Sequence, residues 1–214
     1  MASEPIRDPV KDRLLTPKNS ALIVIDYQPV QVNSIASMDR QLLVNNIVGV
    51  AKIAVTYGLP VVQSSVNVNT GMNKPPIVQL RRVLKDYPTY DRTSINSWED
   101  VEFRAAVEAT GRKKLIMTAL WTEACLTFPA IDALAEGYEV YVVADAVGGT
   151  SPYAHECALR RIEQAGGALI SWTQLLCELQ RDWQRKETVP QFMNLFIETG
   201  GTAGLQFASE TLKD

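Results

Sequence analysis

The chain has 214 residues, of which 46% are hydrophobic and 21% are charged. These proportions are typical of a globular protein and exclude intrinsic disorder and a collagen-like repeat. The formal net charge of −3 argues against a nucleic-acid partner, since proteins that bind nucleic acids are usually basic. The apolar runs are far shorter than the ~20 residues of a membrane span, so we expect no membrane partner either.

The cysteines and the N-terminal residues indicate the compartment. The chain contains three cysteines, Cys125, Cys157 and Cys177, and such an odd, sparse set does not form a disulfide framework. Residues 1–19 carry charges and prolines without the apolar stretch of a signal peptide. We therefore expect reduced thiols and a cytoplasmic protein.

A recurring pattern of helix, glycine and apolar run predicts the secondary structure. Glycine is favoured just after a helix because it adopts the left-handed conformation without steric cost. The runs that follow are rich in valine, isoleucine and tyrosine, as in parallel strands covered on both faces. In chain order, the pattern predicts strands at 21–26, 61–66, 90–93, 114–119, 139–144 and 168–172. It predicts helices at 39–57, 77–85, 98–110, 125–136, 153–164 and 173–185, with a loop at 67–76. The first helix has an apolar stripe formed by Leu42, Leu43, Ile47, Val50, Ile53 and Ala54.

This alternation predicts an α/β protein of three αβα layers, with a doubly wound, mostly parallel six-stranded sheet of Rossmann-like topology. No linker or repeat divides the chain, so we expect a single domain over 1–214 with a core over about 18–186. Residues from about 188 to 214 continue no strand–helix unit and are apolar enough to form an arm, packed on the body or on a neighbouring subunit. Ligands of such sheets bind beyond the carboxyl ends of the strands, so the residues just after each strand are the candidates for function.

Cys125 is the leading candidate for chemistry. It follows the strand that ends at Ala119 and is predicted at a helix N-terminus, where backbone N–H groups and the helix dipole stabilise a thiolate and can hold an oxyanion. Asp26 ends the apolar strand at 21–26, at the same edge of the sheet, where it can take the proton from a thiol. A buried structural cysteine and a turn or N-cap aspartate are the alternatives for these two residues.

The single histidine and the missing motifs narrow the function classes. His155 alone excludes a histidine-rich metal site, and a cysteine–histidine dyad can use only this residue, although a capping or surface role fits it better. The cysteines form no C-x-x-C pair, and no dinucleotide fingerprint follows the first strand. Gly148-Gly149-Thr150 is more typical of a plain turn. We therefore expect no metal and no cofactor.

The pattern of candidate residues resembles a known family. The shared features are an acid after the first strand, a basic residue after the third and the cysteine of a T-E-A-C segment after the fourth. The chain is similar to the isochorismatase-like cysteine hydrolases, and in particular to their YcaC-like subgroup. The resemblance covers about residues 18–186. It depends on four segments, RTSINSWEDVEF at 92–103, ATGRKKLIM at 109–117, WTEACLTFPAIDALAEGYEVYVVADAVG at 121–148 and CELQRDWQR at 177–185.

The resemblance implies a catalytic triad of Asp26, Arg92 and Cys125, with Cys125 as nucleophile and Asp26 as general base. Arg92 stands where most of the superfamily has lysine. Because arginine stays protonated, it would orient Asp26 or a carbonyl group rather than carry a proton. The family also has a cis peptide before the catalytic segment. It maps to Leu120–Trp121 and would aim the backbone N–H groups of Trp121 and Cys125 at one oxyanion.

The activity that the resemblance implies is hydrolysis of a small-molecule amide or related C–N bond through a thioester. Four side chains near the predicted crevice favour a small, partly apolar substrate: Tyr27, Gln28, Trp121 and Phe128. Nicotinamidase relatives that bind a metal have ligands this chain lacks, and the siderophore-pathway isochorismatases lack the cysteine, so both of those reactions are disfavoured. The alternatives are a catalytically weak oligomeric assembly protein and a redox-sensing thiol protein that uses Cys125. YcaC-like proteins form octamers, so a closed homo-oligomer is expected.

Overall fold

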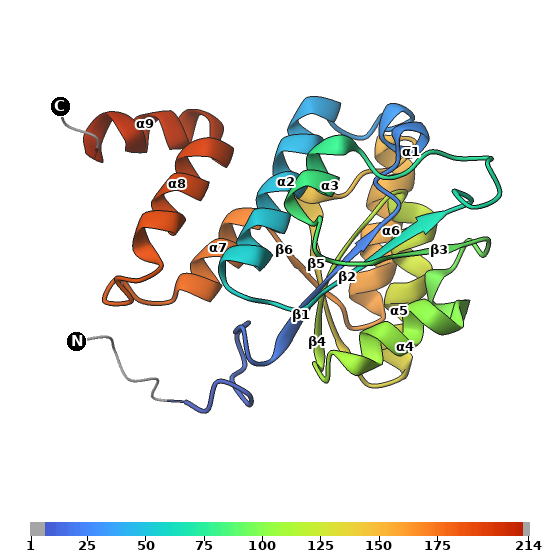
Figure 1. Cartoon of the computed structure of the whole chain (residues 1–214), viewed down its shortest axis with the longest axis horizontal. Coiled ribbons are helices and arrows are strands. Elements are labelled where there is room, and N and C mark those ends of the chain that lie inside the picture. The colour runs from blue at the N-terminus through green and yellow to red at the C-terminus, as the bar shows by residue number, and fades with distance from the viewer. Residues whose placement is uncertain (1–6, 212–214) are drawn as a thin grey trace.

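The computed structural model describes residues 7–211, which form three αβα layers around a central sheet (Figure 1). Within this range the sheet has six strands in the order β3-β2-β1-β4-β5-β6, and each neighbouring pair is parallel. Because the order reverses between β1 and β4, the sheet is doubly wound and the predicted fold class is confirmed. The strands are β1 (Ser20–Ile25), β2 (Val61–Val66), β3 (Thr89–Arg92), β4 (Lys114–Ala119), β5 (Glu139–Val143) and β6 (Ala168–Ile170).

Helices cover both faces of this sheet. One face carries α1 (Pro29–Asn33), α2 (Arg40–Thr56), α3 (Val78–Val83), α7 (Trp172–Gln180) and α8 (Val189–Thr199). The other face carries α4 (Val101–Ala109), α5 (Thr127–Ala135) and α6 (Pro152–Gln164). Successive side chains of a strand point to opposite faces, so Leu22 and Val24 of β1 join the first core, and Ile23 and Ile25 join the second. Among the described residues, none of the helices combines the length and the hydrophobicity that a membrane span requires.

The predicted elements are present, with shifts at their ends that have local causes. β2 and β4 have the predicted bounds, whereas the helix expected at 98–110 is divided into a 3-10 turn, η1 (Ser97–Glu99), and α4. The division falls at Asp100, whose carboxylate accepts the Phe103 N–H and so begins a new helix. Leu42 is 49% exposed, so its expected place in the buried stripe of α2 is wrong.

The last predicted strand and helix also change their bounds. Trp172 was expected to end a strand, but it is the first residue of α7, because the Ser171 hydroxyl caps that helix by accepting the Gln174 N–H. The helix ends at Gln180 rather than at 185, since Arg181 adopts a φ of 60°. Trp183, which the predicted helix at 173–185 includes, is therefore outside it and 61% exposed.

The segment after β4 also departs from its predicted bounds, and this difference affects the surroundings of Cys125. The helix expected at 125–136 begins at Thr122 with one turn of π-helix, η2 (Thr122–Leu126), which continues into α5. The Leu126 N–H donates to the Trp121 carbonyl at 3.2 Å, the wide spacing of a π-turn. Cys125 consequently lies inside a helical turn rather than at a free helix N-terminus.

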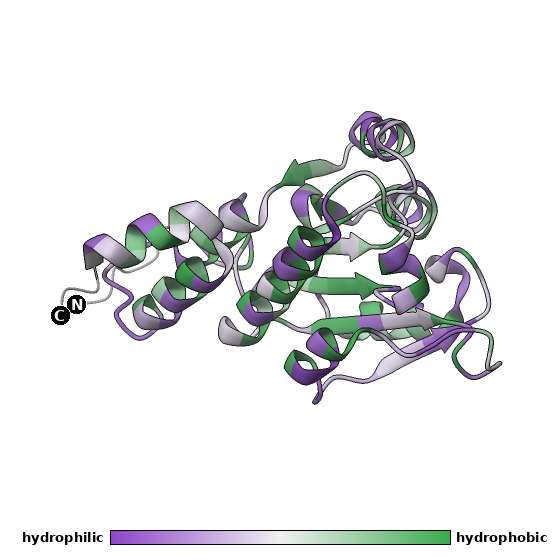
Figure 2. Ribbon diagram, turned by 90° about the horizontal axis from the view of Figure 1, so that it is seen from above, coloured by the Kyte–Doolittle hydropathy of each residue, from purple (hydrophilic) through white to green (hydrophobic). Residues whose placement is uncertain are grey.

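The C-terminal arm consists of α8 and α9 (Gly201–Thr211), which extend from one end of the molecule (Figure 2). α8 packs on α2 and α7 of its own chain and buries Phe192 and Leu195. Gly49 permits this contact, because a Cβ at that position would lie 2.7 Å from Cγ2 of Thr199. Leu212, which the sequence analysis includes in this arm, lies outside the described residues.

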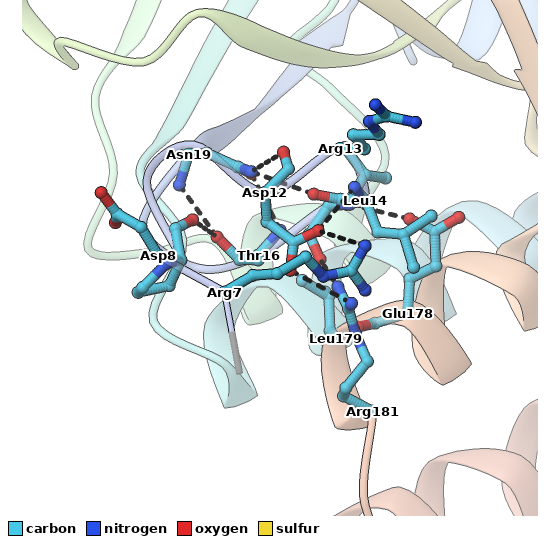
Figure 3. Close-up of polar contacts among 12 residues, drawn as sticks. Arg7, Asp8, Asp12, Arg13, Leu14, Thr16, Asn19, Glu178, Leu179 and Arg181 are labelled. Atoms are coloured by element: carbon cyan, nitrogen blue, oxygen red, sulfur yellow. Dashed lines mark hydrogen bonds and ion pairs between the residues drawn. The ribbon is translucent and has the colours of Figure 1, made fainter. Parts of the chain in front are cut away.

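The N-terminal segment is tied to the end of α7 by polar contacts (Figure 3). Arg181 donates to Asp12 Oδ2 at 3.2 Å and to the Leu15 carbonyl at 3.1 Å, and the Leu15 N–H donates to Glu178 at 2.8 Å. From the start of β4, the buried Lys114 ammonium donates to the Asp12 carbonyl at 2.8 Å. These contacts fix the segment that leads into β1.

Candidate active site

Three of the predicted site residues meet at the carboxyl ends of the strands, where the strand order reverses. Asp26 directly follows β1, Arg92 is the last residue of β3, and Cys125 lies in the π-turn that follows the neighbouring β4. Asp26 adopts a φ of 61°, and its backbone N–H donates to the Ser64 carbonyl of β2 at 3.0 Å. After this backbone turn the Asp26 side chain meets the guanidinium of Arg92.

Asp26 and Arg92 form a bidentate ion pair. Each carboxylate oxygen accepts a hydrogen bond from one guanidinium nitrogen. Nη1 donates to Oδ1 and Nη2 donates to Oδ2, both at 2.7 Å. Both side chains are 0% exposed, so the pair is fully removed from water. The guanidinium also donates to the Ser64 hydroxyl at 3.0 Å, to the Ser65 carbonyl at 3.0 Å and to the Ile95 carbonyl at 3.1 Å.

The environment keeps Arg92 charged. Burial alone would lower the pKa of the guanidinium, but the hydrogen bonds and the charge of Asp26 outweigh it and raise the pKa. Arg92 is therefore a fixed cation bonded to both oxygens of the Asp26 carboxylate, and its expected role of orienting Asp26 for catalysis stays a prediction.

The Cys125 thiol contacts both Asp26 and the preceding turn. Its sulfur is hydrogen-bonded to the Asp26 side chain and to the Trp121 backbone, and the residue is 8% exposed. Burial, the Asp26 charge and the hydrogen bond to Asp26 raise the pKa of the thiol to about 12. This raised pKa disfavours the thiolate that a helix N-terminus would stabilise, because burial and the Asp26 charge outweigh the effect of the helix that begins at Thr122. At neutral pH the group is a thiol that donates to Asp26. The catalytic role of Cys125 stays a prediction.

The peptide bond between Leu120 and Trp121 is cis, at the position that the family resemblance indicates. The Trp121 backbone is within hydrogen-bond reach of the Cys125 sulfur, so this expected oxyanion donor lies beside the thiol. The role of the Cys125 N–H as the second donor stays a prediction.

The four expected pocket residues have different surroundings. Tyr27 is 1% exposed and donates its hydroxyl to the Ala146 carbonyl at 2.6 Å. Gln28 is 0% exposed, and its side-chain amide bonds to the backbone of Val66 and Lys74. The polar atoms of both side chains are thus engaged within the protein, so the expectation that these two residues contact a substrate is not supported.

Trp121 and Phe128 are half-buried but lie apart. The Trp121 indole N–H donates to the Ser34 hydroxyl at 2.6 Å, which anchors the ring over the end of α1. Phe128 lines a cavity of about 270 Å³ with residues of η1, α5 and α6, whose lining contains none of the three triad residues. The geometry therefore favours Trp121 over Phe128 as a neighbour of the reacting atoms.

His155 lies near the π-turn but is bonded to another residue. Its Nδ1 is 2.8 Å from the Thr122 hydroxyl, and burial lowers the pKa of the imidazole, which is therefore neutral at pH 7. The Cys125 thiol has Asp26 as its hydrogen-bonding acid–base neighbour, so the geometry favours Asp26 over His155 as the base. Among residues 7–211 no three histidine, cysteine or acidic side chains are grouped so that they could hold a metal ion.

Comparisons with known proteins identify the family of this chain. The isochorismatase domain model matches residues 20–174. The Escherichia coli K12 protein named "Probable hydrolase YcaC" is 33% identical over 171 residues, which cover 79% of this chain and 82% of that protein. The crystal structure of that gene product, described as an octameric hydrolase of unknown specificity, has a TM-score of 0.87 at 30% identity, covering 94% of this chain and 98% of the other.

Two further structures extend the comparison. YcaC from Pseudomonas aeruginosa, with hexane-2,5-diol and covalent acrylamide, has a TM-score of 0.87 at 29% identity and covers 92% of this chain and 96% of its own. A Bacillus subtilis nicotinamidase has a TM-score of 0.60 at 18% identity over 72% of this chain and 100% of its own, which shows a shared fold alone. The domain match and the coverage of the Escherichia coli relative show that this chain belongs to the isochorismatase family, as its motifs predict.

Proposed function

We propose that this chain is a cysteine-dependent hydrolase that cleaves an amide or related C–N bond of a small molecule. The observation that carries the proposal is the contact of the Cys125 thiol with a carboxylate, Asp26, whose two oxygens are both held by Arg92. A thiol with a pKa of about 12 forms almost no free thiolate at neutral pH, so it reacts only if a neighbouring base takes its proton. Asp26 is placed to do so.

The proposed reaction has two steps. In the first, Asp26 takes the thiol proton while the Cys125 sulfur bonds to the carbonyl carbon, and the Trp121 and Cys125 N–H groups hold the oxyanion. The C–N bond then breaks, and the amine leaves with the proton from Asp26. In the second step, Asp26 takes a proton from a water molecule while the oxygen of that water attacks the thioester carbon. The C–S bond breaks, the acid leaves, and the proton returns to the sulfur.

The related proteins support the same chemistry. The Pseudomonas aeruginosa structure contains covalent acrylamide, a small unsaturated amide, and the Escherichia coli relative is described as a hydrolase. Acrylamide is therefore a suitable first probe for this chain. A thiol adds to its terminal carbon, the C=C π bond breaks, and the thiol proton ends on the carbon next to the carbonyl group.

The test compares acrylamide adducts and amide hydrolysis in wild type and two cysteine variants. We expect an adduct on Cys125 and turnover of at least one member of a small-amide panel, both lost in Cys125→Ser. Cys157→Ser is the matched control, because Cys157 is exposed on α6, and it is expected to keep both activities. Modification of Cys157 or Cys177 in preference to Cys125 contradicts the proposal, and so does turnover that survives Cys125→Ser.

The alternatives have different standing. A redox-sensing role for Cys125 requires an easily formed thiolate, and the raised pKa of this thiol disfavours that role.

Oligomerisation, the other alternative, is compatible with catalysis. We propose a closed homo-oligomer because the Escherichia coli relative is octameric. Light scattering at micromolar concentration tests it, and a monomeric mass would contradict it.

A further inference from the structure

The turn Gly148-Gly149-Thr150, which follows the 3-10 turn η3 (Ala144–Ala146), is bonded to the π-turn that carries Cys125. The Thr122 N–H donates to the Gly148 carbonyl at 2.9 Å, and Leu120 pairs with Gly148 as an isolated parallel bridge. This loop therefore continues the sheet beyond β4 at the point where the Cys125 turn begins.

Glu123, two residues before Cys125, makes the second attachment. Its Oε1 accepts the Thr150 backbone N–H at 3.0 Å and the Thr150 hydroxyl at 2.6 Å. Its Oε2 is buried and has no hydrogen-bond partner among the described residues. Glu123 as a residue is half-buried, but a carboxylate oxygen that is buried without a partner is costly, so its position needs an explanation beyond stability.

Gly149 fits this arrangement because it has no side chain. A Cβ at Gly149 would lie 2.7 Å from Glu123 Oε2 and 3.1 Å from the backbone nitrogen of His155. Only a glycine therefore fits between the Glu123 carboxylate and the start of α6. A larger residue would push the carboxylate away from Thr150.

The other side of the same loop holds the residues that follow α1. The Gly149 N–H donates to the Ser37 hydroxyl at 2.9 Å, and the Gly149 carbonyl accepts the N–H groups of Ala36 and Ser37. Ser34, in the same stretch, accepts the Trp121 indole N–H. Glu123 is thus the side chain that joins the Cys125 turn to a loop already bonded to the residues around Trp121.

We propose that Glu123 is a positioning residue: through Thr150 it fixes the π-turn, so that the Cys125 sulfur and the Trp121 N–H stay aligned with Asp26. This inference rests on the proposed function of Cys125. The role belongs to the Oε1 acceptor rather than to the charge. The proposal predicts that Glu123→Gln, which keeps an acceptor oxygen, preserves the alignment of Cys125 and that Glu123→Ala does not.

The experiment measures acrylamide addition to Cys125 by peptide mass spectrometry across pH 6–10, in Glu123→Ala, Glu123→Gln and Thr150→Val. Exposed Cys157 is the internal reference for each folded protein, and Glu163→Ala, on the exposed face of α6, is the matched control. A misplacement of about 1 Å at a reacting group costs up to ~100-fold in rate. We expect Glu123→Ala to lower the Cys125 rate at least about tenfold without changing how steeply the rate rises with pH. We expect Glu123→Gln to stay within about threefold of wild type and Thr150→Val to lie between.

Each result decides the question. If wild type labels Cys125 and Glu123→Ala labels it equally fast, the positioning role is wrong while the proposed function stands. If wild type does not label Cys125 at all, the proposed function fails first. Equal losses in Glu123→Gln and Glu123→Ala, or a changed dependence of the rate on pH, would show that the charge matters and would overturn the acceptor role. If Glu123→Ala does not fold, Glu123→Gln and Thr150→Val decide by the same criteria.

Discussion

Replacing Asp26 with asparagine keeps the size of the side chain but leaves a buried cation without its counter-charge. The remaining hydrogen-bond partners that the structure gives Arg92 are neutral: the Ser64 hydroxyl and the carbonyls of Ser65 and Ile95. Two unit charges about 4 Å apart attract by ~4 kcal/mol at an effective dielectric constant of 20. Breaking a buried pair on one side costs about 3–5 kcal/mol. We therefore expect Asp26→Asn to lower the free energy of unfolding by about 3 kcal/mol or more.

The assay combines urea unfolding with acrylamide labelling of Cys125 at pH 7. We expect the labelling rate to fall at least about tenfold in Asp26→Asn, because the proton acceptor of the thiol is lost. The double variant Asp26→Asn/Arg92→Met removes both charges, keeps a residue that tolerates the φ of 61° at position 26, and is expected to recover most of the stability but none of the labelling. Asp39→Asn, at the N-cap of α2, is the matched control and should change neither, since asparagine caps as well as aspartate. Wild-type stability and labelling in Asp26→Asn would refute the reasoning.

Three further predictions follow from the contacts of single residues. Arg92→Lys keeps the charge without the fork, so it should retain measurable Cys125 labelling, whereas Arg92→Ala should lose most of it; equal rates in wild type and Arg92→Ala would remove Arg92 from the site. Gly49→Ala places a methyl group against Thr199 and should destabilise the chain by about 1–3 kcal/mol, with faster hydrogen exchange in α8, and Thr199→Ala should relieve the effect. Burial raises the pKa of Asp12, but the Leu14 N–H and the charge of Arg181 outweigh it and lower the pKa. The stability that Asp12 adds is thus present above the unfolded-chain pKa of about 3.9 and is lost as the pH falls below it. Urea unfolding from pH 5 to 2 should show this loss in wild type and a smaller one in Asp12→Asn.

The sequence predicts most of the fold because its signals are local. The apolar runs at 61–66 and 114–119 become β2 and β4 with unchanged bounds. The rule that parallel strands present their carboxyl ends at one edge brings Asp26, Arg92 and Cys125 together, although 66 residues separate Asp26 from Arg92. The distance between them along the chain does not matter, because the strand order determines which ends are neighbours.

Features that depend on contacts between distant residues are not predictable in this way. The Cys125 turn begins at Thr122 because the backbone beyond β4 is bonded to Gly148, and Glu123 matters because of Thr150, which lies 27 residues further along the chain. The pKa of the thiol depends on burial and on the Asp26 charge that faces it, and the sequence shows neither. Thr122 and Glu123 are visible in the sequence just before Cys125. Their partners, Gly148 and Thr150, cannot be identified from the sequence alone.

The composition of β2 connects the fold to the site. β2 lies between β1 and β3, yet Gln63, Ser64 and Ser65 are polar and buried, which is unexpected for an interior parallel strand. Each of them bonds to the segment that carries Arg92: Gln63 to the carbonyls before β3, Ser64 to the Tyr90 carbonyl and Ser65 to the Asp91 carboxylate.

The two serines also let Arg92 reach across β2. Arg92 pairs with Val66 at the end of the strand, and its guanidinium reaches Asp26 while donating to the Ser64 hydroxyl and the Ser65 carbonyl. A β-branched or larger residue at Ser64, as the strand pattern alone would favour, would fill that path and remove an acceptor. The polar interruption of β2 is therefore a requirement of the buried ion pair, and through that pair of the carboxylate that faces Cys125.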